Sequence, residues 1–158
     1  MKDNQGVDPE ASLENYLWHQ IPISSAMGVQ VELATPTRVV IKAPLSNNIN
    51  HKQTVFGGSL HAVATLACWS LLQVNLLQLK HDNVQIVIAS SEIKYLAPVT
   101  TDFKAECSMP ETSDWKKFIK MLEKKGKARL QLTAHIYQQN QLCVDFSGVF
   151  VAIRKNGL

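Results

Sequence analysis

The feature that most constrains the fold is the almost wholly apolar run at residues 59–79, which directly follows the pair Gly57-Gly58. A helix from Gly57 to about Lys80 would be on the order of 36 Å long at about 1.5 Å per residue. Its polar residues are too few for a fully solvated face, so other elements must wrap it. They are also too many for a bilayer, and the sequence therefore predicts no membrane span. These interruptions are His61, Thr65, Ser70, Gln73, Asn75 and Gln78.

Composition bounds the classes of protein to which the chain belongs. With 158 residues and 46% apolar content, one domain can bury a core without disulfides or metal. The net charge of +3 is too small for a nucleic-acid-binding protein. The polar, acidic start does not resemble a secretory signal. Three widely spaced cysteines in apolar surroundings suit buried free thiols in a reducing compartment, so we expect a cytoplasmic protein. They are Cys68, Cys107 and Cys143.

Periodicity places the remaining elements around the long helix. Residues 1–11 lack periodicity and predict a flexible tail, and residues 12–158 form one domain. Ser12 is the expected cap of a short helix over 13–20, and a second amphipathic helix lies between 109 and 126, with Ser113 as its cap and Gly126 as its end. Segments rich in β-branched and aromatic residues predict strands at 29–34, 37–43, 84–99, 102–109, 128–138 and 142–153.

The order of these elements indicates the fold class. Two strands precede the long helix and four follow it, with the other helices outside the strand runs. Such segregation favours an α+β domain in which a mainly antiparallel sheet curls around the central helix.

Four segments of this chain resemble the hotdog fold of acyl-CoA thioesterases. They are Asn50-His51-Lys52-Gln53-Thr54-Val55-Phe56-Gly57-Gly58, the apolar helix, Ser90-Ser91-Glu92-Ile93-Lys94-Tyr95-Leu96-Ala97-Pro98, and residues 126–153. Within that superfamily the chain is most similar to the YiiD-type thioesterase-like domain, which elsewhere can follow a GNAT acetyltransferase domain. Here the sequence has no room for the acetyltransferase part.

The resemblance implies hydrolysis of an acyl thioester of coenzyme A or acyl carrier protein. It implies a homodimer, or a tetramer of such dimers, with the active cleft at the subunit interface. The acyl chain would lie along the apolar helix and water would attack directly. Neither a metal nor a bound cofactor is implied, since coenzyme A is part of the substrate.

The resemblance also suggests catalytic positions. The backbone N–H of Gly57 or Gly58, at the start of the helix, would bind the oxyanion. Alternatively, the pair only permits a tight turn and close packing. Asn50 aligns with the residue that orients the carbonyl or the water; as an alternative, it only forms a turn.

Two departures from the family pattern concern the general base. Phe56 stands where many members have histidine, and Thr65 stands where many have a catalytic carboxylate. His61 and Thr65 share one face of the helix with Gly58. Neutral His61 would then act as the base, or Thr65 would position a water. The alternative is that the Thr65 hydroxyl bonds to the carbonyl of His61, and that His61 lies at a rim or dimer contact.

Further residues are candidates for substrate binding. His51 and Phe56 lie in the loop before the helix, and the strand after it carries Ser90, Ser91 and Glu92, the last being the nearest sequence candidate for a carboxylate. A basic run would meet the phosphates of coenzyme A or the acidic surface of acyl carrier protein; the alternative is that it forms only a solvated helix face. The members of this run that we expect to bind are Lys124, Lys127 and Arg129.

Two other functions remain open from the sequence. The same oxyanion site would serve an acyltransferase or condensing enzyme that acts on thioesters. Without a helical carboxylate, the domain could instead be a non-catalytic acyl-CoA binding module.

Overall fold

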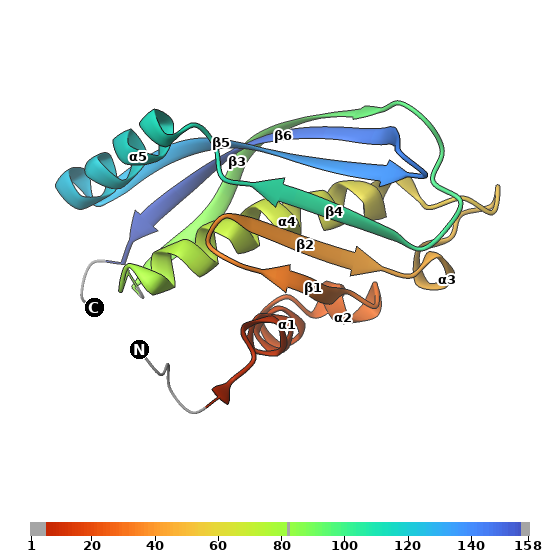
Figure 1. Cartoon of the computed structure of the whole chain (residues 1–158), viewed down its shortest axis with the longest axis horizontal. Helices are drawn as coiled ribbons and strands as arrows, with labels where there is room; N and C mark the ends of the chain where they lie inside the picture. The colour runs from red at the N-terminus through yellow and green to blue at the C-terminus, as the bar shows by residue number, and fades with distance from the viewer. Residues whose placement is uncertain (1–5, 82, 156–158) are drawn as a thin grey trace.

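The computed structural model describes residues 6–81 and 83–155 and has the α+β architecture expected from the sequence (Figure 1). One antiparallel sheet of six strands, in the order β1-β2-β4-β5-β6-β3, curls around the long helix α4. The elements are α1 Pro9–Gln20, α2 Pro22–Ala26, β1 Gln30–Ala34, β2 Arg38–Ala43, α3 Leu45–Asn48, α4 Gly57–Gln78, β3 Val84–Tyr95, β4 Phe103–Ser108, α5 Thr112–Lys125, β5 Lys127–Gln138 and β6 Gln141–Arg154.

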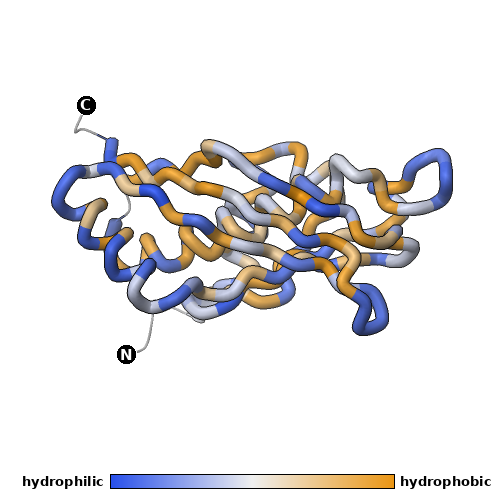
Figure 2. Tube along the Cα trace, turned by 90° about the horizontal axis from the view of Figure 1, so that it is seen from above, coloured by the Kyte–Doolittle hydropathy of each residue, from blue (hydrophilic) through white to orange (hydrophobic). Residues whose placement is uncertain are grey.

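The core lies between α4 and the inner face of the sheet, the face that is turned toward the helix. Along β5, buried and exposed side chains alternate, with Leu130 and Leu132 inside and Arg129 outside, as period-two geometry requires. Figure 2 shows hydrophobic stretches along the strands and hydrophilic turns at the ends of the molecule. By length and composition α4 could cross a membrane, but most of it is buried against the sheet. It is the core helix.

The helices differ from the sequence prediction in their ends. Helix α1 begins at Pro9, because the Asp8 carboxylate accepts from the Glu10 amide at 3.2 Å and proline suits the first turn. The expected cap Ser12 lies inside the helix. In α5 the cap position is Glu111, not Ser113, and Gly126 ends the helix in the left-handed conformation, as predicted. The part of the expected tail at residues 1–5 lies outside the described residues.

The first edge strand, β1, is covered by side chains of α1. Glu14 accepts a hydrogen bond from the Val31 amide at 2.9 Å, and Glu10 accepts one from the Ala34 amide at 3.0 Å. Carboxylates of the helix thus occupy amides that an edge strand would leave free.

The other edge strand, β3, is long and exposed. It ends at Tyr95, short of the predicted residue 99, because Leu96 and Ala97 turn their amides to the Cys143 carbonyl. Ile86 is its one buried side chain, whereas Val87 and Tyr95 are about half exposed. This edge has no strand partner among the described residues.

The three cysteines are buried free thiols, as predicted. Burial raises the pKa of the Cys68 thiol well above its ordinary value, and the neighbouring Cys107 thiol raises it further. Because the thiolate is the reactive form, we expect the native protein to react negligibly with a thiol reagent at pH 8 and to react at all three cysteines once unfolded in guanidinium. Rapid native labelling of Cys68 would contradict its placement in the core.

Candidate active site

The start of α4 presents two unpaired backbone amides. The amides of Ser59 and Leu60 both donate to the Phe56 carbonyl, at 3.0 and 3.2 Å. No side chain caps the helix, and the amides of Gly57 and Gly58 have no acceptor within the described part of the chain. Unpaired donors at the positive end of a helix dipole favour a bound or developing negative charge.

The fold itself does not require glycine at position 57. Its φ is not positive, and an added Cβ would meet only the Tyr95 ring, at an ordinary 3.5 Å. The Tyr95 hydroxyl donates to the Gly57 carbonyl at 3.1 Å and supports this first turn. At Gly58 a Cβ would meet the ring of Phe56, which is 58% exposed and free to move. The tight-turn explanation is therefore weak at Gly57.

A Gly57→Ala variant separates folding from function. We expect its free energy of unfolding to stay within about 1 kcal/mol of wild type, since alanine suits a helix at least as well as glycine. We expect thioester turnover to fall about 100-fold, because the methyl group would displace a carbonyl from the two amides. Thermal melting and steady-state kinetics measure the two effects. Unchanged kinetics would show that no ligand approaches this glycine.

His61, Thr65 and Ser91 form a connected polar cluster beside these amides. The His61 Nε2 atom lies 2.9 Å from the Ser91 Oγ atom. The Thr65 hydroxyl donates to the His61 carbonyl at 2.9 Å, as the alternative sequence interpretation expected, and its oxygen also lies 3.5 Å from His61 Nδ1. The structure therefore joins two of the predicted catalytic residues to one predicted binding residue.

The remaining contacts of His61 fix its ring. Phe146, fully buried on the inner face of β6, meets it edge-on with ring centroids 5.3 Å apart. On β3, Ser91 pairs with Gly148 on the inner face, whereas Ser90 pairs with Val149 on the outer face. The two neighbours of Ser91 in the strand, Ser90 and Glu92, thus point away from α4. The Glu92 carboxylate therefore does not take the place of the missing acid on the helix.

The side chain of Asn50 is engaged within its own loop. Its amide group donates to Thr54 Oγ1 at 2.9 Å, and its oxygen accepts from the amides of Lys52 and Thr54 at 2.9 and 3.2 Å. These bonds match the alternative in which Asn50 forms a turn. His51, next to it, is exposed. A role of either residue toward a substrate stays a prediction.

The predicted basic residues lie at the other end of α4. Helix α5 lies near the C-terminal end of α4, because the Glu123 Oε1 atom of α5 is 3.8 Å from Nε2 of His81, which follows α4. Gly57 is at the opposite end of α4, about 33 Å away at about 1.5 Å per residue. Within one chain, the lysines of α5 are therefore not brought to the amides. Lys124, Lys127 and Arg129 are all exposed.

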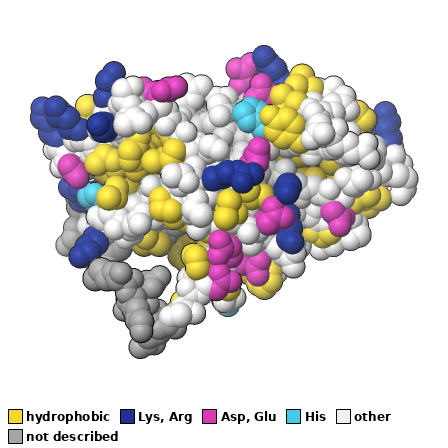
Figure 3. Space-filling model, in the orientation of Figure 1, with side chains coloured by type: hydrophobic (Ala, Val, Ile, Leu, Met, Phe, Trp, Pro, Cys, Tyr) yellow, Lys and Arg dark blue, Asp and Glu magenta, His cyan; other side chains and the backbone are white. Residues whose placement is uncertain are grey.

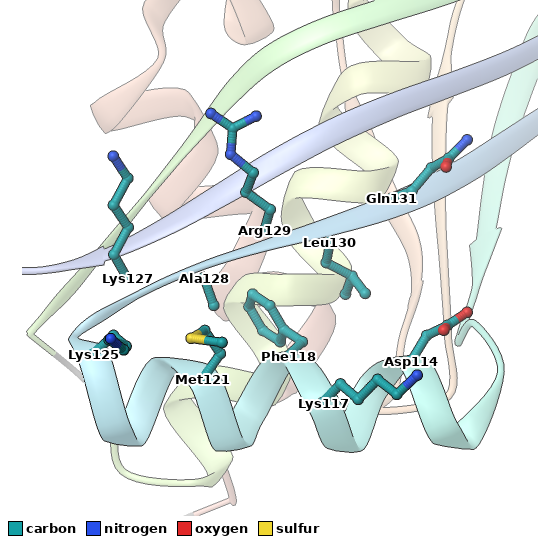
Figure 4. A pocket seen from close by; sticks show the side chains of 10 residues that line it. All are labelled: Asp114, Lys117, Phe118, Met121, Lys125, Lys127, Ala128, Arg129, Leu130 and Gln131. Carbon is teal, nitrogen blue, oxygen red and sulfur yellow. The ribbon is translucent and has the colours of Figure 1, made fainter.

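A groove of about 850 Å³ lies between α5 and β5 (Figure 4). Figure 4 shows Phe118, Met121 and Leu130 between the helix and the strand, while Lys127 and Arg129 point away from the helix. Figure 3 shows a hydrophobic patch near dark-blue lysine and arginine side chains at the end of the molecule that carries α5. None of the residues lining this groove belongs to the cluster around His61.

A metal centre has no support from the side chains that the structure describes. No group of three His, Cys, Asp or Glu residues in residues 6–81 and 83–155 is arranged to hold an ion. The expectation of no cofactor stays a prediction.

The sequence matches a family model described as "Putative thioesterase (yiiD_Cterm)" over residues 10–154. This chain belongs to that family. The match covers every strand of the sheet and all of the cluster around His61, so the resemblance seen in the sequence is confirmed.

The fold of this chain is similar to that of several solved structures. A protein of unknown function from Chlorobaculum tepidum is similar with a TM-score of 0.86 at 32% identity, over 92% of this chain and 94% of that one. A putative thioesterase from Shewanella oneidensis matches at 0.80 and 29% identity, over 91% and 96%. A thioesterase from Haemophilus influenzae, at 12% identity, shares the fold with a TM-score of 0.72 over 94% and 92%. The chain is a hotdog domain, as predicted.

Two residues that hold the site of this family member in place were not predicted from the sequence. Tyr95, which bonds to the Gly57 carbonyl, and Phe146, which packs on His61, were not expected there. Phe146 belongs to an alternating strand pattern and was predictable as an inner-face residue, but not its contact with His61. Only the register of β3 on β6 places Tyr95 over α4.

Proposed function

We propose that this family member hydrolyses acyl thioesters of coenzyme A or of acyl carrier protein. The observation that carries the proposal is the pair of unpaired amides at Gly57 and Gly58 beside the His61 imidazole. The amides would stabilise the oxyanion that forms when the thioester carbonyl is attacked, a contribution of about 3 to 4 kcal/mol for one such donor. His61 would take the proton of the attacking group. Membership of a thioesterase family supports the same reaction.

The second part of the proposal is a homodimer formed through the β3 edge. A free strand of this length pairs readily with another strand, and antiparallel pairing of two copies gives a closed two-fold interface. Apolar side chains on and near this edge are between 39 and 58% exposed. They are Phe56, Val87, Ile88, Tyr95 and Leu96. The partner would then form the second wall of the cleft over His61.

Such pairing would also explain how the basic residues, which lie far from the amides within one chain, approach a bound substrate. Antiparallel pairing places the Val84 end of the partner's β3 beside this chain's Tyr95. Lys127 and Gln85 both pair with Ile153, so β5 begins at that same Val84 end of the sheet. The partner's Lys127 and the partner's Arg129 would therefore lie about three strand spacings, roughly 14 Å, from this chain's Tyr95, which lies over the amides. They would meet the phosphates of coenzyme A there.

We also propose that the protein is cytoplasmic, because free buried thiols suit a reducing compartment.

An assay panel tests the proposed reaction. The purified protein is incubated with acyl-CoAs of increasing chain length and with acyl carrier protein thioesters, and released thiol is measured. Release without any acceptor supports hydrolysis. Release only when an acceptor amine or thiol is added would instead show an acyltransferase, and binding without release would show a non-catalytic acyl-CoA module.

A further inference from the structure

We propose that Ser91 is a covalent nucleophile, so that hydrolysis proceeds through an acyl-serine and not by direct attack of water. This inference rests on the proposed thioesterase function and deepens it. Its starting observation is that the group at hydrogen-bond distance from His61 Nε2 is a side-chain hydroxyl, Ser91 Oγ, at 2.9 Å. A nucleophile paired with a base in this way is the arrangement that activates serine in enzymes.

The other ring nitrogen decides which way the proton points. The Thr65 hydroxyl donates its single hydrogen to the His61 carbonyl at 2.9 Å, so its oxygen is left as an acceptor. That oxygen is the polar atom found near His61 Nδ1 in the described structure, at 3.5 Å. A hydrogen on Nδ1 is therefore favoured, which leaves the Nε2 lone pair to accept from the Ser91 hydroxyl. Thr65 is a positioning residue in this scheme.

The rest of the site fits the same geometry. Gly57, Gly58, His61 and Thr65 recur at helical spacing on one face of α4. Ser91 reaches that face from β3 because it is on the inner side of the sheet, opposite Gly148. A Cβ at Gly148 would come within 2.9 Å of Phe150 and 3.1 Å of Phe146, so glycine at this position leaves room for the Phe146 ring that packs on His61. One carbonyl can thus face the amides and the serine oxygen together.

The reaction balances without any further reactant except water. Ser91 Oγ bonds to the thioester carbonyl carbon while its proton passes to His61 Nε2, and the amides hold the oxyanion. The C–S bond then breaks, and the thiolate takes the proton from His61. Water attacks the acyl-serine in the same way, giving a proton to His61; the C–O bond breaks, Ser91 Oγ regains the proton and the carboxylic acid leaves.

The first experiment uses a small fluorophosphonate and no thioester, so it is independent of the proposed substrate. We expect one adduct per chain, located by mass spectrometry on the peptide that contains Ser91. The rate of labelling should fall about 100-fold or more in His61→Ala. An exposed strand serine provides the matched control, since Ser108→Ala should label like wild type.

The second experiment quenches turnover of an acyl-CoA with acid. We expect a mass increase of one acyl group on the Ser91 peptide, absent from Ser91→Ala, whose turnover should fall about 100-fold while its melting temperature stays near wild type. Absence of an adduct in both experiments overturns the proposal, whatever the activity of Ser91→Ala. Fluorophosphonate labelling of Ser91 without hydrolysis of any thioester would keep the nucleophile and refute the proposed function.

Discussion

Replacing His61 by alanine is expected to lower kcat for acyl-CoA hydrolysis by roughly 10²–10⁴, with little change in KM. The imidazole is the one base within hydrogen-bond distance of Ser91 in the described structure, and the neighbouring β3 carboxylate faces the other way. Its contribution belongs to proton transfer in the transition state, so binding of the substrate should survive its loss. Steady-state kinetics with the best acyl-CoA of the panel measure both constants.

Two variants make this result specific. His61→Gln retains much of the packing on Phe146 but no base of comparable strength, and should be as inactive as His61→Ala. His135→Ala removes a histidine of the outer face, 3.2 Å from Asp145, and should retain wild-type kinetics. Near wild-type rates in both His61 variants would exclude the histidine as base.

Placing a charge on the exposed edge is expected to abolish both the dimer and turnover. Val87 is 48% exposed on the outer face of β3, so Val87→Lys should leave the monomer folded, with a change in unfolding free energy of about 1 kcal/mol or less. Lysine on an edge strand opposes strand pairing. Sedimentation should then show 17.6 kDa in place of twice that mass, and activity should fall in proportion to the remaining dimer.

The control for this variant is a similar change away from the edge. Met121 on α5 is 45% exposed, and Met121→Lys should remain dimeric and active. A wild-type protein that sediments as a monomer with full turnover would refute the interface cleft.

The long elements of the fold were predictable because their patterns are repeated many times. The apolar run of α4 and the alternation along β5 each contain enough residues to reveal their period. Helices α2 and α3, of five and four residues, are too short to show one, and both were missed. The true start of α1 depends on a single capping contact from Asp8.

The site was predictable only in part, since its decisive contact depends on a strand irregularity. The register of β3 on β6 shifts between Ile88 and Ser90. Strict alternation from Ile86 and Ile88 would turn Ser90 toward α4, but the shift turns Ser91 there instead. Sequence reasoning named both serines without choosing between them. The proposal of a serine nucleophile in place of direct water attack rests on this one irregularity.

The carboxylates of α1 have a consequence for how far the protein can assemble. Glu10 and Glu14 occupy amides of β1, so of the two outer strands only β3 offers a bare backbone to another chain. Under the proposed pairing, growth by strand addition would stop after a single step, because two copies joined at β3 would leave a blocked edge at each end. The protein would then keep one long exposed edge strand at high concentration without forming fibres, and any larger assembly would be built from the faces of the sheet.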